Sequence, residues 1–121
     1  MKPVLPGDVT AAARALLPLP PEARSGLARR LIDEACAADL HCRRTGQAHR
    51  CWGNGTLLGA AHGHEMGRET CFEDPEFLDC QVKMLEALRA FHQPEAQEIQ
   101  RLAVGSSSRR LTAISSPQSP Q

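Results

Sequence analysis

Aromatic residues are scarce in this sequence, which contains no tyrosine, three phenylalanines and one tryptophan. An extensive β-sheet is disfavoured, because strands are enriched in aromatic and β-branched side chains. No apolar run approaches the length of a membrane-spanning helix. Leu and Ala supply much of the apolar content, and both are good helix formers. These features predict an all-α protein, a small helical domain of four to five helices.

The chain also lacks the marks of a secreted protein. Its first residues, MKPVLPGDV, contain no apolar segment of the kind found in signal peptides. The number of cysteines is odd, which fits free thiols better than a framework of disulfides. We therefore expect a cytoplasmic protein with reduced cysteines, which are Cys36, Cys42, Cys51, Cys71 and Cys80.

The net charge is zero, which excludes a uniformly basic nucleic-acid-binding protein. The charges are nevertheless unevenly distributed. Residues 1–50 contain eight basic and five acidic side chains, whereas residues 65–86 contain two basic and seven acidic ones. One face could therefore bind a polyanion with strong salt dependence. A solvated surface of mixed sign is the alternative.

Two helices are expected in the first half of the chain. Asp8 is a suitable N-cap for the first helix, which Pro18 and Pro20 end. Pro21 suits the first turn of a longer second helix, and Gly46 suits its C-terminal cap. The predicted buried stripes are Val9, Ala12, Ala13, Leu16 and Leu17 in the first helix, and Leu27, Leu31, Ile32, Ala35, Ala38 and Cys42 in the second.

Residues 47–55 are predicted to form a loop with a tight turn at Asn54–Gly55. We expect Trp52 to anchor this loop to the core, with its indole N–H hydrogen-bonded. Thr56 is a suitable N-cap for a short helix that ends near residue 61. Leu57 and Leu58 are the pair that this helix is expected to bury.

A further helix is expected from Pro75 to about residue 92, capped by Asp74. Its predicted apolar stripe would form the core or an oligomer interface and consists of Phe77, Leu78, Val82, Leu85, Leu88 and Phe91. Another helix is predicted over 95–104. Residues 1–104 would then form the helical domain, and residues 105–121, rich in Ser, Pro and Gln, a disordered tail.

Catalytic and metal-binding motifs find little support. Cysteines and histidines cluster between residues 42 and 64, but no CxxC pair is present, so no metal site is assigned and a zinc-stabilised module remains only an alternative. GNGTLLG resembles a glycine-rich phosphate loop, but its spacing is wrong and no Walker lysine follows. No nucleophile elbow or HExxH motif occurs. We therefore expect a protein that is not an enzyme and has no cofactor.

The arginine content of residues 24–50 is the sequence feature that most favours a nucleic-acid partner. Six arginines and only three acidic residues lie between positions 24 and 50. Guanidinium groups suit phosphate contacts. A solvated surface explains any single arginine equally well, and Arg43 and Arg44 also suit the C-terminal end of a helix. The predicted DNA-binding residues are Arg29, Arg30, Arg43, Arg44 and Arg50.

Three segments, AARALL, RRTGQAH and WGNGTL, carry a resemblance to a known family. Over about residues 3–92 the chain resembles small helical proteins encoded at the head of phage-like gene transfer agent clusters, which look like small terminase subunits. The resemblance implies a homo-oligomer that binds double-stranded DNA weakly, with little sequence preference, and recruits the large terminase. The sequence departs from the usual pattern in lacking an N-terminal helix-turn-helix, so the resemblance does not identify the DNA-contact surface.

Partner binding is expected in the tail, where basic residues precede apolar ones. The expected contacts to the large terminase are Arg109, Arg110, Leu111 and Ile114. The alternative function is a small cytoplasmic protein-interaction or regulatory module without DNA binding. In that case the acidic stretch 65–79 would contact a basic partner.

Overall fold

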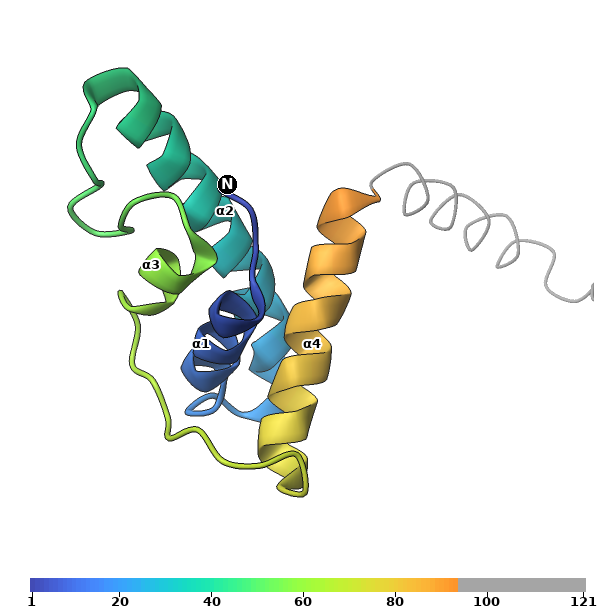
Figure 1. The fold of residues 1–121 in the computed structure, drawn as a ribbon. Coiled ribbons are helices and arrows are strands. Elements are labelled where there is room, and N and C mark those ends of the chain that lie inside the picture. Colours follow the sequence, from blue (N-terminus) through green and yellow to red (C-terminus); the bar gives the residue numbers. More distant parts are fainter. Residues whose placement is uncertain (94–121) are drawn as a thin grey trace, which may run out of the picture. The chain divides into compact units, whose positions relative to one another are not determined.

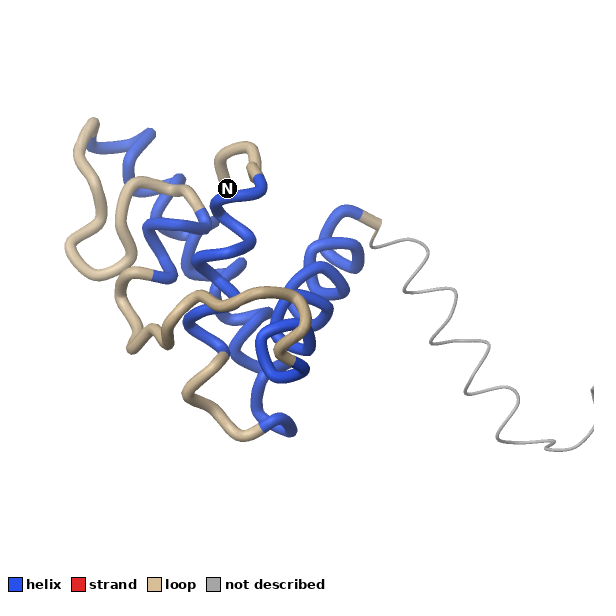
Figure 2. The backbone as a smooth tube through the Cα atoms, turned by 60° about the horizontal axis from the view of Figure 1, so that its bottom comes forward, coloured by secondary structure: helices blue, strands red, loops and turns tan. Residues whose placement is uncertain are grey.

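The computed structural model describes residues 1–93, which fold into four helices joined by turns and loops (Figures 1 and 2). They are α1 (Pro6–Leu16), α2 (Pro21–Thr45), α3 (Leu57–Ala61) and α4 (Pro75–His92). The described residues contain no strand, which confirms the predicted all-α class. No helix among them is long and apolar enough to cross a membrane. The predicted helix over 95–104 and the tail lie outside the described residues.

The predicted starts and ends of the helices are mostly confirmed. Pro21 opens α2, and Gly46 ends it in the left-handed conformation with φ 75°. The Thr56 hydroxyl caps α3 by accepting from Gly59 N at 3.0 Å. Asp74 caps α4, since its carboxylate accepts from Glu76 N at 3.0 Å. Local side-chain chemistry therefore sets these boundaries.

The prediction that Asp8 is the N-cap of α1 was wrong. The helix begins at Pro6, so Asp8 lies in its first turn. Its carboxylate accepts from Leu5 N at 2.8 Å and from Leu58 N at 3.1 Å. The side chain is buried and joins the first turns of α1 and α3. This second role depends on a residue fifty positions away, which local sequence rules do not consider.

Small side chains fill much of the core. Ala12, Ala13 and Ala28 are fully buried, which allows helix backbones to approach closely. The predicted stripes of α1 and α2 are confirmed except at their ends, where Leu17 and Cys42 are only half-buried. The largest fully buried side chains are Phe77, Leu16, Leu31, Leu57, Met84 and Cys80. The expected burial of Leu58 was wrong, since this side chain is exposed.

Helix α4 has a buried face and exposed apolar residues, and the predicted stripe took members from both. The buried face comprises Phe77, Cys80, Gln81, Met84 and Leu88. Within the predicted stripe only the two ends of this face, Phe77 and Leu88, are buried. The other members, Leu78, Val82, Leu85 and Phe91, are exposed. The stripe was expected to form the core or an oligomer interface. Membership of the core is wrong for these four exposed residues, and the buried face includes Cys80, Gln81 and Met84, which the stripe omitted.

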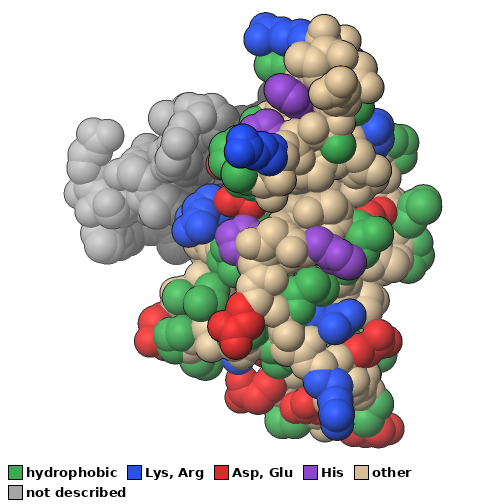
Figure 3. All heavy atoms as spheres, turned by 90° about the vertical axis from the view of Figure 1, so that its left-hand side faces the viewer, with side chains coloured by type: hydrophobic (Ala, Val, Ile, Leu, Met, Phe, Trp, Pro, Cys, Tyr) green, Lys and Arg blue, Asp and Glu red, His purple; other side chains and the backbone are tan. Residues whose placement is uncertain are grey.

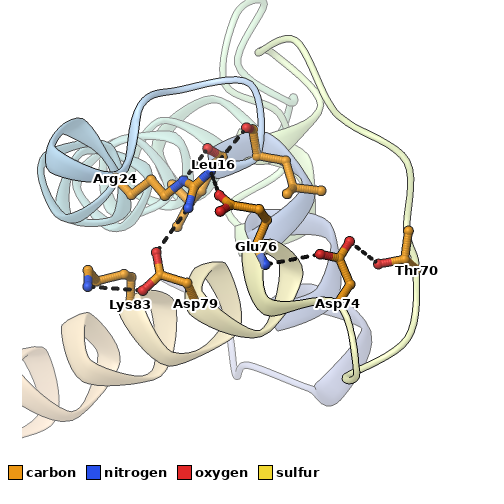
Figure 4. Close-up of polar contacts among 8 residues, drawn as sticks. Leu16, Arg24, Thr70, Asp74, Glu76, Asp79 and Lys83 are labelled. Carbon is orange, nitrogen blue, oxygen red and sulfur yellow. Dashed lines mark hydrogen bonds and ion pairs between the residues drawn. The ribbon is translucent and has the colours of Figure 1, made fainter.

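Arg24 is the buried centre of a polar cluster that involves α1, α2 and α4 (Figure 4). Its guanidinium lies 2.8 Å from the Glu76 carboxylate and 3.0 Å from that of Asp79. It also donates to the carbonyl oxygens of Leu16, at 3.3 Å, and Leu17, at 3.4 Å. Arg24 therefore donates hydrogen bonds to carbonyl groups that the end of α1 leaves without a helical partner. Its ion pairs also connect the start of α2 to the start of α4.

The same cluster shifts the pKa values of its members. Burial alone would lower the pKa of Arg24, but hydrogen bonds to Glu76 and Asp79 outweigh it and raise the pKa. The hydrogen bond from Arg24 lowers the pKa of Asp79, and the hydrogen bond from Lys83 lowers it further. Both groups are therefore charged at neutral pH.

Candidate nucleic-acid interface

The loop between α2 and α3 contains two glycines at which any side chain would be strained. Gly53 has φ 85°, and a Cβ there would lie 2.9 Å from the Cα of Gly59. Gly55 has φ 100°, and a Cβ there would lie 2.8 Å from the Cα of Asp39. Such separations are too short for real Cβ contacts, so the loop lies directly on α2 and α3. The predicted tight turn at this site is therefore part of a close-packed loop.

The loop is also closed on itself. His49 and Gly53 exchange two backbone hydrogen bonds, of 2.7 Å and 3.1 Å. The Asn54 side chain accepts from both the backbone N–H and the hydroxyl of Thr56. Residues 49–56 thus form a defined structure that fixes where the exposed side chain of Arg50 emerges.

The expectation that Trp52 anchors the loop to the core was wrong. Trp52 is half-buried and is not part of the apolar core. Its indole N–H has no hydrogen-bond partner among the described residues. The ring instead stacks on His49, with centroids 4.6 Å apart and planes 6° from parallel. Sequence periodicity could not reveal this pair, because both residues lie in a loop.

The end of α2 is held by a carboxylate with two cationic partners. Asp39 is buried, and its carboxylate lies 2.7 Å from the Arg43 guanidinium and 3.2 Å from the α-amino group of Met1. The hydrogen bond from Arg43 is the largest of the effects that lower the pKa of Asp39. Arg43 therefore has a structural role, although 71% of its side chain remains exposed.

Four of the five predicted DNA-binding arginines lie on the same broad face of α2. At about 100° per residue, Arg29, Arg30, Arg43 and Arg44 fall within a sector of about 140°, opposite the buried residues. The first pair and the last pair are separated by roughly 21 Å along the helix axis. Arg50 follows in the loop, and all five side chains are exposed.

These arginines differ in how far other groups neutralise them. Arg30 lies 3.7 Å from Glu34, which also contacts a ring nitrogen of His64 at 2.9 Å. Arg29 and Arg30 also share their face with the exposed Asp33. Among residues 1–93, Arg29, Arg44 and Arg50 form no ion pair, and of these three only Arg29 shares its helix face with a nearby acidic side chain, Asp33. The least neutralised part of the predicted surface is therefore the end of α2 together with the loop.

Figure 3 shows how charge is distributed over one face of the molecule. Acidic side chains gather mainly in its lower half. The upper part, where the C-terminal end of α2 lies in Figure 1, shows Lys, Arg and His side chains with few acidic ones. This separation matches the uneven distribution of charge along the sequence.

The described residues contain no group of three or more His, Cys, Asp or Glu side chains that could hold a metal ion. Cys80 is buried, and burial raises the pKa of its thiol, which keeps it protonated. The predicted partner-binding residues Arg109, Arg110, Leu111 and Ile114 lie outside the described residues.

Comparison with known proteins identifies a family for this chain. A family model described as Domain of unknown function (DUF7742) matches residues 2–88. No curated protein and no solved structure gives a significant match. The matched region contains all of α1, α2 and α3, the glycine-built loop and most of α4. The chain therefore belongs to the DUF7742 family.

Proposed function

We propose that this protein is a non-catalytic DNA-packaging adaptor, similar to a small terminase, that binds double-stranded DNA with little sequence preference. The observation that carries the proposal is the exposure of Arg44 and Arg50 without an ion-pair partner in the described part of the chain. A guanidinium group that is free of internal partners is available to a phosphate.

The arrangement of the other arginines supports the same proposal. The roughly 21 Å between the two arginine pairs of α2 covers several phosphates along one DNA strand. The hydrogen bonds of the loop fix the backbone around Arg50, so little backbone ordering is needed when its side chain binds a phosphate. Phosphate contacts of this kind carry no sequence information, which fits binding without a preferred site.

A salt titration of DNA binding tests the proposal. Fluorescence anisotropy with a labelled 20-base-pair duplex should show affinity falling steeply between 50 and 200 mM salt. The variant Arg44→Ala/Arg50→Ala should bind more weakly, and the slope of log Kd against log salt should decrease by about 2. The control is Arg68→Ala, which removes an exposed arginine outside the proposed surface. Binding that does not depend on salt, or an equal loss in the control, contradicts the proposal.

Self-association is part of the proposed function, and the exposed face of α4 supports it. Leu78, Val82 and Leu85 are each more than 40% exposed and lie at helical spacing on one face. Sedimentation velocity on the wild type and on Leu78→Ser/Leu85→Ser tests this part. A monomeric wild type, or an unchanged oligomer in the variant, contradicts it.

Recruitment of the large terminase is the remaining part of the proposal, through Arg109, Arg110, Leu111 and Ile114. Deletion of residues 106–121 should abolish co-purification with the large terminase. Undiminished co-purification contradicts this role.

A protein-interaction module without DNA binding is the second candidate. The exposure of Glu65, Glu69 and Glu73 favours it, since these carboxylates could contact a basic partner. The neighbouring genes distinguish the two candidate functions. The gene of a DNA-packaging adaptor is expected beside a large terminase gene, and the gene of an interaction module is not.

A further inference from the structure

The only tryptophan of the chain is placed where it does not stabilise the core. Trp52 lies in a loop, half-buried, although a buried tryptophan would contribute more apolar area than any other residue of this protein. Its indole N–H is left without a partner among the described residues. The apolar core consists mainly of Leu and Ala side chains, with Phe77 as its aromatic member. This location calls for an explanation other than packing.

The ring is part of an ordered aromatic stack. Trp52 lies nearly parallel to His49, and the edge of His41 contacts His49 with centroids 5.1 Å apart and planes at 77°. His49 Nδ1 accepts hydrogen bonds from Cys51 N at 3.0 Å and Trp52 N at 3.1 Å. These bonds fix the His49 ring, which supports the indole before any ligand binds.

The stack belongs to the segment that carries the least neutralised positive charge. Arg50 directly follows His49 in the chain, and Arg44 is at the end of the helix that also carries His41. Aromatic rings beside arginines are the combination by which proteins bind single-stranded nucleic acids: the bases stack on the rings, and the guanidinium groups contact the phosphates. Duplex DNA, in contrast, keeps its bases stacked on each other and offers mainly phosphates to such a surface.

We propose that the His49–Trp52 stack is a binding site for an unpaired DNA base, with Arg44 and Arg50 contacting the adjacent phosphates. The inference rests on the proposed function, because the same arginines are assigned to duplex DNA. It goes further by giving the protein a preference for single-stranded or frayed DNA over a blunt duplex of equal length.

The lone tryptophan provides a direct measurement. Its fluorescence is followed while the full-length protein is titrated with a 12-nucleotide oligodeoxythymidylate and, separately, with a blunt 12-base-pair duplex at the same salt concentration. The single strand should quench Trp52 in a saturable manner, and the duplex, which contacts Arg44 and Arg50 without stacking on the ring, should quench it much less. Equal responses to both DNAs, or none to the single strand, would overturn the inference.

Variants separate stacking from charge. Trp52→Ala should weaken binding of the oligodeoxythymidylate roughly tenfold, as expected for the loss of one base–aromatic stack. Its affinity for the duplex, measured by anisotropy, should change less than twofold. Trp52→Phe retains a ring and should preserve part of the single-strand affinity, which keeps the test informative if the alanine variant unfolds. If Trp52→Ala weakened the binding of both DNAs equally, the result would show that Trp52 only supports the structure of the loop.

The two proposals fail in different ways. Salt-dependent duplex binding that requires Arg44 and Arg50, without any effect of Trp52 on the single strand, overturns only the stacking site. Absence of binding to both DNAs overturns both proposals.

Discussion

The two ends of α2 use arginine in opposite ways. At the start of the helix, 4% of the Arg24 side chain is exposed, and two carboxylates and two backbone carbonyls satisfy its guanidinium. At the other end, Arg44 is exposed and forms no ion pair within residues 1–93. The residue type and the helix are the same, so the difference comes from what surrounds each side chain.

This comparison assigns the six arginines between positions 24 and 50 to separate roles. Arg24 is buried and paired with carboxylates inside the protein. It therefore cannot contribute to a nucleic-acid-binding surface, although its charge alone would suggest such a role. Arg43 is intermediate, because it holds Asp39 while most of its side chain remains in solvent. The strongest proposed DNA contacts, Arg44 and Arg50, therefore lie at one end of α2 and in the following loop, with Arg29 and Arg30 as weaker contacts further along the helix. The following predictions test the division between these exposed arginines and Arg24.

The largest effect is expected from removing the buried arginine. Arg24→Ala leaves Glu76 without its cationic partner, leaves Asp79 with Lys83 alone, and removes the hydrogen bonds to the end of α1. It should lower the free energy of unfolding by about 2–4 kcal/mol, somewhat less than for a fully buried pair because Glu76 is largely exposed. Urea denaturation measures the loss. Arg29→Ala, an exposed arginine of the same helix, is the control and should change stability by less than about 0.5 kcal/mol. If the two variants lowered the free energy of unfolding equally, the division between a buried structural arginine and exposed arginines would be refuted.

The next effect concerns the loop that presents Arg50. Gly55→Ala introduces a Cβ at φ 100° and 2.8 Å from Asp39, so it should cost about 2–3 kcal/mol and disturb the loop. Gly46→Ala is the matched control, since its φ is also positive but a Cβ would meet no atom within 4 Å. Its expected cost is about 1 kcal/mol, and thermal unfolding compares the two. A Gly55 variant as stable as the Gly46 variant would show that the loop is not closely packed on α2.

A smaller effect is expected from acid. Because Arg24 lowers the pKa of Asp79 in the folded protein, the ionised Asp79 contributes stability at all pH values above its unfolded pKa, near 3.8. This contribution is lost as the pH falls through the lower, folded value. The difference in unfolding free energy between the wild type and Asp79→Asn should therefore be constant from pH 7 to 5 and should shrink below pH 4. A difference that stays constant down to pH 2 would show that Asp79 does not interact with Arg24 as a charged group.

Much of the fold could be predicted from the sequence, because local chemistry sets the helix boundaries. Pro21, Gly46, Thr56 and Asp74 each act on backbone groups within a few residues, so their roles depend little on the rest of the molecule. Burial was harder to predict. Leu58 and Leu78 have the apolar character of core residues, but no other element within residues 1–93 covers them.

The candidate site shows the same limit. The exposed arginines could be identified from their number and spacing, whereas the buried state of Arg24 depends on residues more than fifty positions away. Trp52 was assigned to the core because tryptophan is usually buried, and the loop geometry that places it on His49 has no periodic signature. The features that the sequence pattern placed incorrectly therefore depend on long-range packing or on irregular loop geometry.

The central claim is that DNA binds the C-terminal end of α2 and the following loop, not the Arg24 cluster. Nuclear magnetic resonance of the ¹⁵N-labelled protein, titrated with a short duplex, tests this most directly. The account predicts that backbone amide shifts change over residues 41–54 and stay unchanged around Arg24, Glu76 and Asp79. Shift changes confined to the acidic stretch 65–79, or an absence of changes over residues 41–54, would contradict it.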